Sequence, residues 1–278
     1  MKLGVRQVLK VVRIKDFGAY LAGDDDEQAI LLPKKELSKD VDIGSEIEVF
    51  VYRDSSDRLI ATTRKTLIEV GEVARLKVKD ISKIGAFVDI GLERDVLLPY
   101  KEMKKQLEKS EEILCALYID RTQRLAATMK IYPYLKTTTD YKNDDEVNAY
   151  IYEIKDIGVL AAVEDKFYGL IPKSEIYTKL QIGDTVNARI LRVREDNKLD
   201  LSLRKKAYLQ LEEDAKYLES ELEKRNGRLG IGESASPETI KNEFKLSKKA
   251  FKRAIGHLLK ERKIEILEND IVKVGERK

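Results

Sequence analysis

The chain has 278 residues, and with 42% hydrophobic and 37% charged side chains it can bury a core beneath an unusually charged surface. Its 53 basic and 50 acidic side chains leave a net charge of only +3, which is too balanced to indicate a nucleic-acid partner from composition alone. A single cysteine, Cys115, excludes an intrachain disulfide and a cysteine-rich metal site. The first residues lack the apolar core of a signal peptide and no run of about 18 apolar residues occurs, so we expect a cytoplasmic protein without membrane contact.

Three copies of one pattern follow one another along the first 205 residues. Each copy has a glycine within an apolar stretch, at Gly18, Gly85 or Gly158, and reaches a proline 14 or 15 residues later. A short polar segment follows each proline, and the segments after it alternate apolar and polar residues as β-strands do. Five strands in roughly 65 residues are typical of a small Greek-key barrel. A glycine inside a strand predicts the sharp bend that such a barrel needs.

The periodicity changes after Lys205 and predicts helices. The expected helices cover residues 207–223, 239–244 and 248–263. On the third helix, the side chains expected to face the core are Phe251, Ile255, Leu258 and Leu259. A β-hairpin over residues 264–274 completes the order of elements in a winged helix.

We therefore predict a mainly β chain with a C-terminal α+β part, in which three tandem five-stranded OB-fold barrels precede a winged-helix domain. The expected domains cover residues 1–66, 67–138, 139–205 and 206–278.

A resemblance to the RNA-binding OB module named after ribosomal protein S1 rests on three segments: Phe17-Gly18-Ala19-Tyr20, Ile84-Gly85-Ala86-Phe87 and Leu199-Asp200-Leu201-Ser202-Leu203-Arg204. Three S1-type barrels followed by a winged helix are similar to the bacterial conserved virulence factor B family, whose members are described as RNA-binding regulators. The stretch over residues 246–256 is the most family-like passage. The resemblance implies RNA binding and gene regulation.

The resemblance places base-stacking aromatic side chains at Phe17 and Tyr20 in the first barrel and at Phe87 in the second. OB barrels bind single strands by stacking bases on exposed aromatic rings beside a basic groove. The third barrel carries Ile157 and Leu160 at the matching positions, and a proline replaces the usual histidine of the module in every copy. Partly buried barrel packing is the alternative role of these aromatic residues.

The third barrel and the winged helix supply the remaining candidate RNA contacts. In the barrel these candidates are Tyr150, Tyr152, Tyr168, Lys173, Arg189, Arg192 and Arg194. We expect the three arginines to alternate along one strand and to share a face. In the mildly basic winged helix the candidates are Lys245, Lys248, Lys249, Lys252 and Arg253. Phosphate contacts from such residues depend strongly on salt, and a solvated charged surface is the alternative for both sets.

No catalytic site, metal site or cofactor is predicted. The chain has no phosphate loop of the Walker type and no nucleophile elbow. Its one histidine, His257, lies on an expected helix beside core positions, where a structural role is favoured over catalysis. The acidic run over residues 24–27 is expected to form a solvated turn.

The sequence thus predicts a non-enzymatic RNA-binding protein, a post-transcriptional or virulence-gene regulator that binds single-stranded RNA through its barrels and winged helix. Two alternatives stay open. The winged helix could read duplex DNA in a transcriptional regulator, or the domains could form a protein-interaction scaffold. The sequence leaves open the target RNA, the barrel that dominates binding and the oligomeric state.

Overall fold

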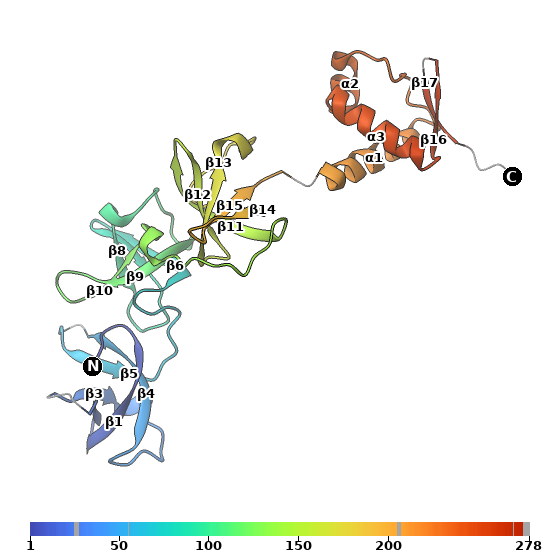
Figure 1. Cartoon of the computed structure of the whole chain (residues 1–278). Coiled ribbons are helices and arrows are strands. Elements are labelled where there is room, and N and C mark those ends of the chain that lie inside the picture. The colour runs from blue at the N-terminus through green and yellow to red at the C-terminus, as the bar shows by residue number, and fades with distance from the viewer. Residues whose placement is uncertain (25–27, 55, 205–206, 269, 275–278) are drawn as a thin grey trace. The chain divides into compact units, whose positions relative to one another are not determined.

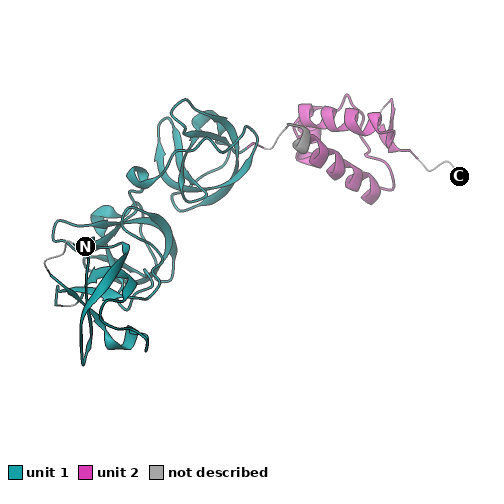
Figure 2. Ribbon diagram, turned by 60° about the horizontal axis from the view of Figure 1, so that its bottom comes forward, with its two compact units in different colours: residues 1–203 teal, residues 204–278 magenta. Residues whose placement is uncertain are grey.

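The computed structural model describes the chain except for residues 25–27, 55, 205–206, 269 and 275–278, so most of the acidic run at 24–27 lies outside the described residues. The chain divides into two compact units, residues 1–203 and residues 204–278 (Figure 2). The first unit consists of three β-barrels, and the second contains helices and a two-stranded sheet (Figure 1). Within the described residues, the helices are all too short or too polar to span a membrane.

The three barrels share one topology. Barrel 1 contains β1 (Arg6–Lys15), β2 (Gly18–Ala22), β3 (Ile30–Pro33), β4 (Glu46–Arg53) and β5 (Leu59–Thr62). Barrel 2 contains β6 (Val73–Ser82), β7 (Gly85–Val88), β8 (Val96–Pro99), β9 (Glu112–Ile119) and β10 (Leu125–Thr128). Barrel 3 contains β11 (Glu146–Lys155), β12 (Gly158–Val163), β13 (Phe167–Pro172), β14 (Thr185–Val193) and β15 (Leu199–Ser202).

In every barrel the third strand pairs in parallel with the fifth, and the fourth strand closes the sheet against the first. A short 3-10 helix follows each third strand: η1 (Lys34–Glu36), η2 (Tyr100–Glu102) and η4 (Lys173–Glu175). The prediction of three five-stranded OB-type barrels is therefore confirmed.

The repeated glycine has a steric role. Gly18 and Gly158 each begin the second strand of their barrel, with φ angles of +153° and +147°. A Cβ atom there would overlap the carbonyl oxygen of Leu32 or Ile171 on the neighbouring strand. The glycine thus permits close approach of two strands at the end of a hairpin, whereas the sequence predicted a bend within a strand.

Neighbouring barrels are joined by backbone hydrogen bonds and by buried side chains. Between barrels 1 and 2, the Val70 amide donates to the Gly4 carbonyl oxygen at 2.8 Å. Gly4 is held on barrel 1 by its own amide, which donates to the Val51 carbonyl oxygen at 2.7 Å. Barrels 2 and 3 share a buried apolar cluster, formed by Leu114, Ala116, Ile131, Leu135, Tyr150, Tyr152 and Ala162. These contacts make residues 1–203 one compact unit.

The segment between barrels 2 and 3 is held against barrel 3. It contains η3 (Tyr132–Tyr134) and then runs beside β13. The Lys136 amide donates to the Lys166 carbonyl oxygen at 2.8 Å, and the Lys136 carbonyl oxygen accepts from the Tyr168 amide at 3.0 Å. We retain the four-domain division as a proposal, with the addition that this segment is bonded to barrel 3.

The second unit has the helices and hairpin expected of a winged helix. Its elements are α1 (Ala207–Lys224), α2 (Pro237–Phe244), α3 (Lys248–Lys260), β16 (Ile264–Leu267) and β17 (Asp270–Lys273). The side-chain oxygen atoms of Ser236 and Ser247 accept backbone hydrogen bonds at the starts of α2 and α3, as N-cap residues do. The prediction that Leu259 faces the core was wrong, since it is 44% exposed. Ala254 takes part in the core, because residues 251, 254, 255 and 258 form one face of the helix.

Candidate nucleic-acid interface

Barrel 1 exposes a cluster of two aromatic rings and one cation, which we call the barrel 1 platform: Arg13, Phe17 and Tyr20. Phe17 lies in the turn between β1 and β2 and is 57% exposed, and Tyr20 on β2 is half-buried. The two rings meet edge to face, with centroids 6.1 Å apart. The β-ladder pairs Arg13 with Tyr20 and places its guanidinium carbon 4.3 Å from the Tyr20 centroid. The platform therefore presents the exposed ring of Phe17 beside a cation that lies over Tyr20.

Phe87 of barrel 2 lies in a cleft. The cleft has a volume of about 380 Å³, and its walls include Ile84 and Leu97 of barrel 2 and Tyr52 of barrel 1. The β-ladder pairs Phe87 with Asp80, whereas the matching position of barrel 1 holds Arg13. A carboxylate beside the ring repels phosphate, so barrel 2 lacks the charge pattern of the barrel 1 platform.

Two predicted contacts of barrel 3, Tyr150 and Tyr152, are buried. They are only 2% and 3% exposed, and they pack in the cluster that barrels 2 and 3 share. Burial raises the pKa of both hydroxyl groups. Alternation along β11 does point both rings away from the barrel interior, but barrel 2 covers that face. Their burial removes both rings from the candidate surface.

Tyr168 does lie at the surface, in a group that the sequence analysis missed, which we call the linker platform: Tyr132, Tyr168 and Lys198. Tyr132 is 45% exposed, and its ring centroid lies 4.8 Å from that of Tyr168. The Tyr168 hydroxyl donates to the Tyr132 carbonyl oxygen at 2.7 Å. The ammonium nitrogen of Lys198 lies 5.2 Å from the Tyr168 centroid and 6.0 Å from the Tyr132 centroid.

The signal for this group was the aromatic run Tyr132-Pro133-Tyr134, which stands between two repeats. A search confined to matching positions within the repeats cannot find it.

The three predicted arginine contacts, Arg189 and Arg192 on β14 and Arg194 just after it, share the outward face of barrel 3. Strict alternation along the strand does not explain this shared face. Arg189 and Arg192 are three residues apart, which in a regular strand puts them on opposite faces. A β-bulge between Ile190 and Arg192 restores them to one face. Each arginine has a carboxylate partner, and these partners are Asp144, Asp200 and Asp196 for Arg189, Arg192 and Arg194. These partners reduce the positive charge that the strand offers to phosphate.

Asp200 is a polar residue at a position that is apolar in the other barrels. The parallel ladders place Ile60 of barrel 1 and Ala126 of barrel 2 at the equivalent positions. Asp200 is 5% exposed, and its Oδ2 accepts from the Arg192 Nε at 2.7 Å. Its Oδ1 is buried without a hydrogen-bond partner in the described part of the chain. An unpaired buried oxygen costs free energy of folding.

The predicted lysine and arginine contacts outside β14 are exposed or half-buried. Lys173 is exposed at the start of η4, and Lys245 is exposed at the end of α2, where its φ angle is +57°. Lys248 is half-buried, and the predicted contacts that α3 exposes are Lys249, Lys252 and Arg253. Spacings of three and four residues put these last three on one helix face. Lys252 pairs with Glu233 at 3.6 Å.

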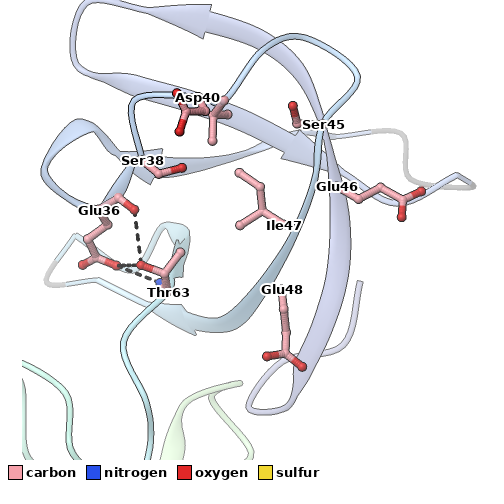
Figure 3. A pocket seen from close by; sticks show the side chains of 9 residues that line it. Glu36, Ser38, Asp40, Ser45, Glu46, Ile47, Glu48 and Thr63 are labelled. Carbon is pink, nitrogen blue, oxygen red and sulfur yellow. Dashed lines mark hydrogen bonds between the residues drawn. The ribbon is translucent and has the colours of Figure 1, made fainter.

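A hollow on barrel 1 is unsuited to nucleic acid. It has a volume of about 550 Å³, and Figure 3 shows carboxylates around it at Glu36, Asp40, Glu46 and Glu48. The Glu36 side chain is also held by the Thr63 amide at 2.8 Å. Clustered carboxylates repel a polyanion, so this side of barrel 1 is excluded from the candidate interface.

The described residues contain no group of three or more His, Cys, Asp or Glu side chains that could hold a metal ion. Cys115 is buried, and burial raises the pKa of its thiol to about 12, so the thiol stays protonated at neutral pH. His257 lies on α3 with its Nε2 3.3 Å from a Glu261 carboxylate oxygen.

Domain-family comparisons cover most of the chain. A model of the S1 domain matches residues 3–64 and 70–130. A model of the second domain of virulence regulatory factor CvfB matches residues 133–205, and a model of the CvfB-like winged helix domain matches residues 216–272.

Whole-chain comparisons agree with these matches. Protein YitL of Bacillus subtilis is 30% identical over 275 residues, which cover 95% of this chain and 91% of the relative. Conserved virulence factor B of Staphylococcus epidermidis is also 30% identical, over 95% of this chain and 92% of the relative. A crystal structure of a multidomain protein with nucleic acid binding domains from Streptococcus pneumoniae covers 98% of both chains. It has 24% identity and a TM-score of 0.51, which shows a shared fold.

Proposed function

The chain belongs to the conserved virulence factor B family, and on this premise we propose that it binds single-stranded RNA and regulates gene expression after transcription. S1 and winged-helix domains are nucleic-acid-binding domain types, and neither is enzymatic. The proposal places the protein in the cytoplasm.

The barrel 1 platform is the observation that carries the preference for an unpaired strand. Phe17 offers an exposed ring to a base, and Arg13 offers a guanidinium group beside it. No carboxylate in the described part of the chain lies within ion-pair distance of Arg13, so its charge is available to phosphate. A base stacked on an aromatic side chain contributes about 1–3 kcal/mol, and duplex bases are already stacked and cannot use such a ring.

Phosphate contacts from α3 supply a second, sequence-independent contribution. Lys249 and Arg253 lie on one exposed face, without an ion-pair partner among the described residues. Neutralising phosphates releases counterions, so this contribution falls as salt rises. Linking both units in one chain raises affinity beyond that of either, provided that one RNA can reach both.

The test is fluorescence anisotropy with labelled oligo(U), oligo(A) and duplex DNA at about 50 and about 200 mM salt. A fragment of residues 1–205 is titrated beside the full chain. We expect both single strands to bind more tightly than the duplex, salt to weaken binding, and the fragment to bind less tightly. Absence of single-strand binding at low salt would overturn the proposal and favour the protein-interaction scaffold.

The exposed cations of α3 also support a second candidate, a duplex-DNA reader. In winged helices the third helix commonly contacts a nucleic-acid groove. The variant in which Lys249, Lys252 and Arg253 are all changed to Gln separates the two. Loss of duplex binding alone would favour the DNA reader, whereas loss of part of the single-strand affinity agrees with RNA binding.

A further inference from the structure

We propose that the linker platform, Tyr132, Tyr168 and Lys198, is a second base-stacking site for single-stranded RNA. It lies on barrel 3 but takes its most exposed ring from the segment that joins barrels 2 and 3. This inference rests on the proposed function, because it adds a contact site for the same ligand.

The platform is built on a rigid base. The Lys136 amide is bonded to Lys166, just before β13, and its carbonyl oxygen accepts from Tyr168 on β13. The Thr138 amide donates to the Asn197 carbonyl oxygen at 3.0 Å. The bond from the Tyr168 hydroxyl to the Tyr132 carbonyl oxygen ties the exposed residue to the strand beside it. A site whose groups are already fixed loses little conformational entropy when a ligand binds.

Tyr132 is exposed, whereas Tyr168 is half-buried and packs against the cluster between barrels 2 and 3. Tyr152 and the neighbouring apolar residues are buried and already fill the space between the barrels. Tyr132 is not part of this cluster and is 45% exposed. Its interplanar angle of 61° with Tyr168 leaves a ring face open rather than stacked on the neighbouring ring. An exposed tyrosine ring held in place by its neighbours is suited to stacking an unpaired base.

Lys198 supplies the charge that a nucleotide needs beside its base. Its ammonium group lies within reach of both rings and forms an ion pair with Asp196 at 3.2 Å. The hydrogen bond to Asp196 raises the pKa of Lys198, so the cation persists throughout the neutral range. From this position, the Lys198 ammonium group can attract the phosphate of a nucleotide whose base is stacked on Tyr132.

The platform also supplies what the strands of barrel 3 lack. Ile157 and Leu160 occupy the positions of Phe17 and Tyr20, and Glu153 faces Leu160 where Arg13 faces Tyr20. Barrel 3 therefore has no aromatic ring and no unpaired cation at the positions used in barrel 1. The linker platform provides a ring beside β13, together with a cation whose charge is partly balanced by Asp196.

The experiment compares Tyr132→Ala with Tyr100→Ala in the full chain. Tyr100 is a matched control, because it also begins a 3-10 helix and is 53% exposed. We expect Tyr132→Ala to weaken oligo(U) binding about tenfold, and Tyr100→Ala to weaken it less than twofold. Tyr132→Phe keeps the ring and should keep the affinity. Lys198→Gln should weaken binding about threefold and reduce the salt slope by about one.

Photocross-linking locates the contact directly. An oligonucleotide that carries 5-iodouracil is irradiated with the wild-type chain, and cross-linked peptides are mapped by mass spectrometry. A cross-link at Tyr132 or Tyr168 supports the proposal. Oligo(U) binding by the wild-type chain without loss in Tyr132→Ala overturns the linker platform and leaves the proposed function standing. Failure of the wild-type chain to bind any single strand overturns the proposed function first. Circular dichroism confirms that each variant is folded.

Discussion

Barrel 1 and barrel 3 share a strand order but differ on the outer face that the S1 resemblance marks for RNA. Inward residues and the glycine at the start of the second strand are alike in both. On the outer face, Arg13 and Tyr20 of barrel 1 correspond to Glu153 and Leu160 of barrel 3. One topology is thus maintained by its core, while the residues at matching surface positions differ in charge and aromatic character.

The two barrels also differ in where their exposed aromatic rings originate. In barrel 1 the rings belong to the repeat itself, whereas in barrel 3 one ring is supplied by the preceding segment, at Tyr132. A neighbouring barrel or segment can thus cover part of a barrel's surface, as barrel 2 covers Tyr150. It can also add side chains to that surface, as the segment with Tyr132 does.

The largest effect should come from the feature that both barrels share. Replacing Gly18 or Gly158 by alanine forces a Cβ into the carbonyl oxygen of the adjacent strand. We expect each variant to lose about 3 kcal/mol or more of unfolding free energy, measured by urea denaturation. Gly44→Ala is the control, because Gly44 has a positive φ but open space around it, and it should lose only about 1 kcal/mol. Similar losses in all three variants would contradict the steric explanation.

A smaller effect should separate the outer faces of the two barrels. Phe17→Ala removes the exposed ring of barrel 1 and should weaken oligo(U) binding about tenfold, since one base loses its stacking partner. Ile157→Ala changes the matching residue of barrel 3 and should alter the affinity less than twofold. Anisotropy titration at low salt measures both. Equal losses would mean that the strand positions of barrel 3 bind RNA without an aromatic ring.

A substitution at Asp200 should raise the unfolding free energy, whereas the glycine substitutions should lower it. Asp200→Ile places in barrel 3 the residue that barrel 1 has at Ile60, and it removes a buried oxygen without a partner. We expect the unfolding free energy to rise by about 1 kcal/mol, and Arg192 to remain solvated at the surface. Asp200→Asn keeps a polar side chain at the site and should bring no gain. A loss of stability in Asp200→Ile would show that the carboxylate is needed for the fold.

The smallest expected effect concerns charge. Arg13→Gln should weaken oligo(U) binding about twofold to threefold and lower its salt dependence, because a guanidinium group near the phosphates is lost. Glu153→Gln removes a negative charge at the matching position of barrel 3 and should leave the affinity unchanged or slightly increased. Titrations at several salt concentrations compare the two. Equal weakening by both variants would refute a distinct role for Arg13.

The fold was predictable because its cause is local. The glycine, the alternating strands and the proline recur at nearly constant spacing, so three copies support one another. Helical periodicity marked the winged helix in the same way. Leu259 was misplaced because three- and four-residue spacing left two candidate positions at the edge of the buried face, and only packing decides between them.

The candidate surface was less predictable because it depends on contacts between barrels. Alternation correctly points Tyr150 outward from its barrel, yet it cannot reveal that another barrel covers that side. Tyr132 lies outside every repeat, and only the pairing of its segment with β13 brings it beside Tyr168. A bulge in β14, which has no clear sequence signal, sets the shared face of the arginines.

The hydrogen-bonded segment between barrels 2 and 3 has consequences for proteolysis of the chain and for the exchange of its domains in evolution. Chymotrypsin cleaves after aromatic residues, but Pro133 blocks cleavage after Tyr132. Cleavage after Tyr134 requires local opening of the segment, because Lys136 is hydrogen-bonded to barrel 3. Any exchange that transferred barrel 3 without residues 131–138 would expose an apolar strip and lose Tyr132 as well. We therefore expect barrels 2 and 3 to be inherited together, with the segment between them as part of the same evolutionary unit.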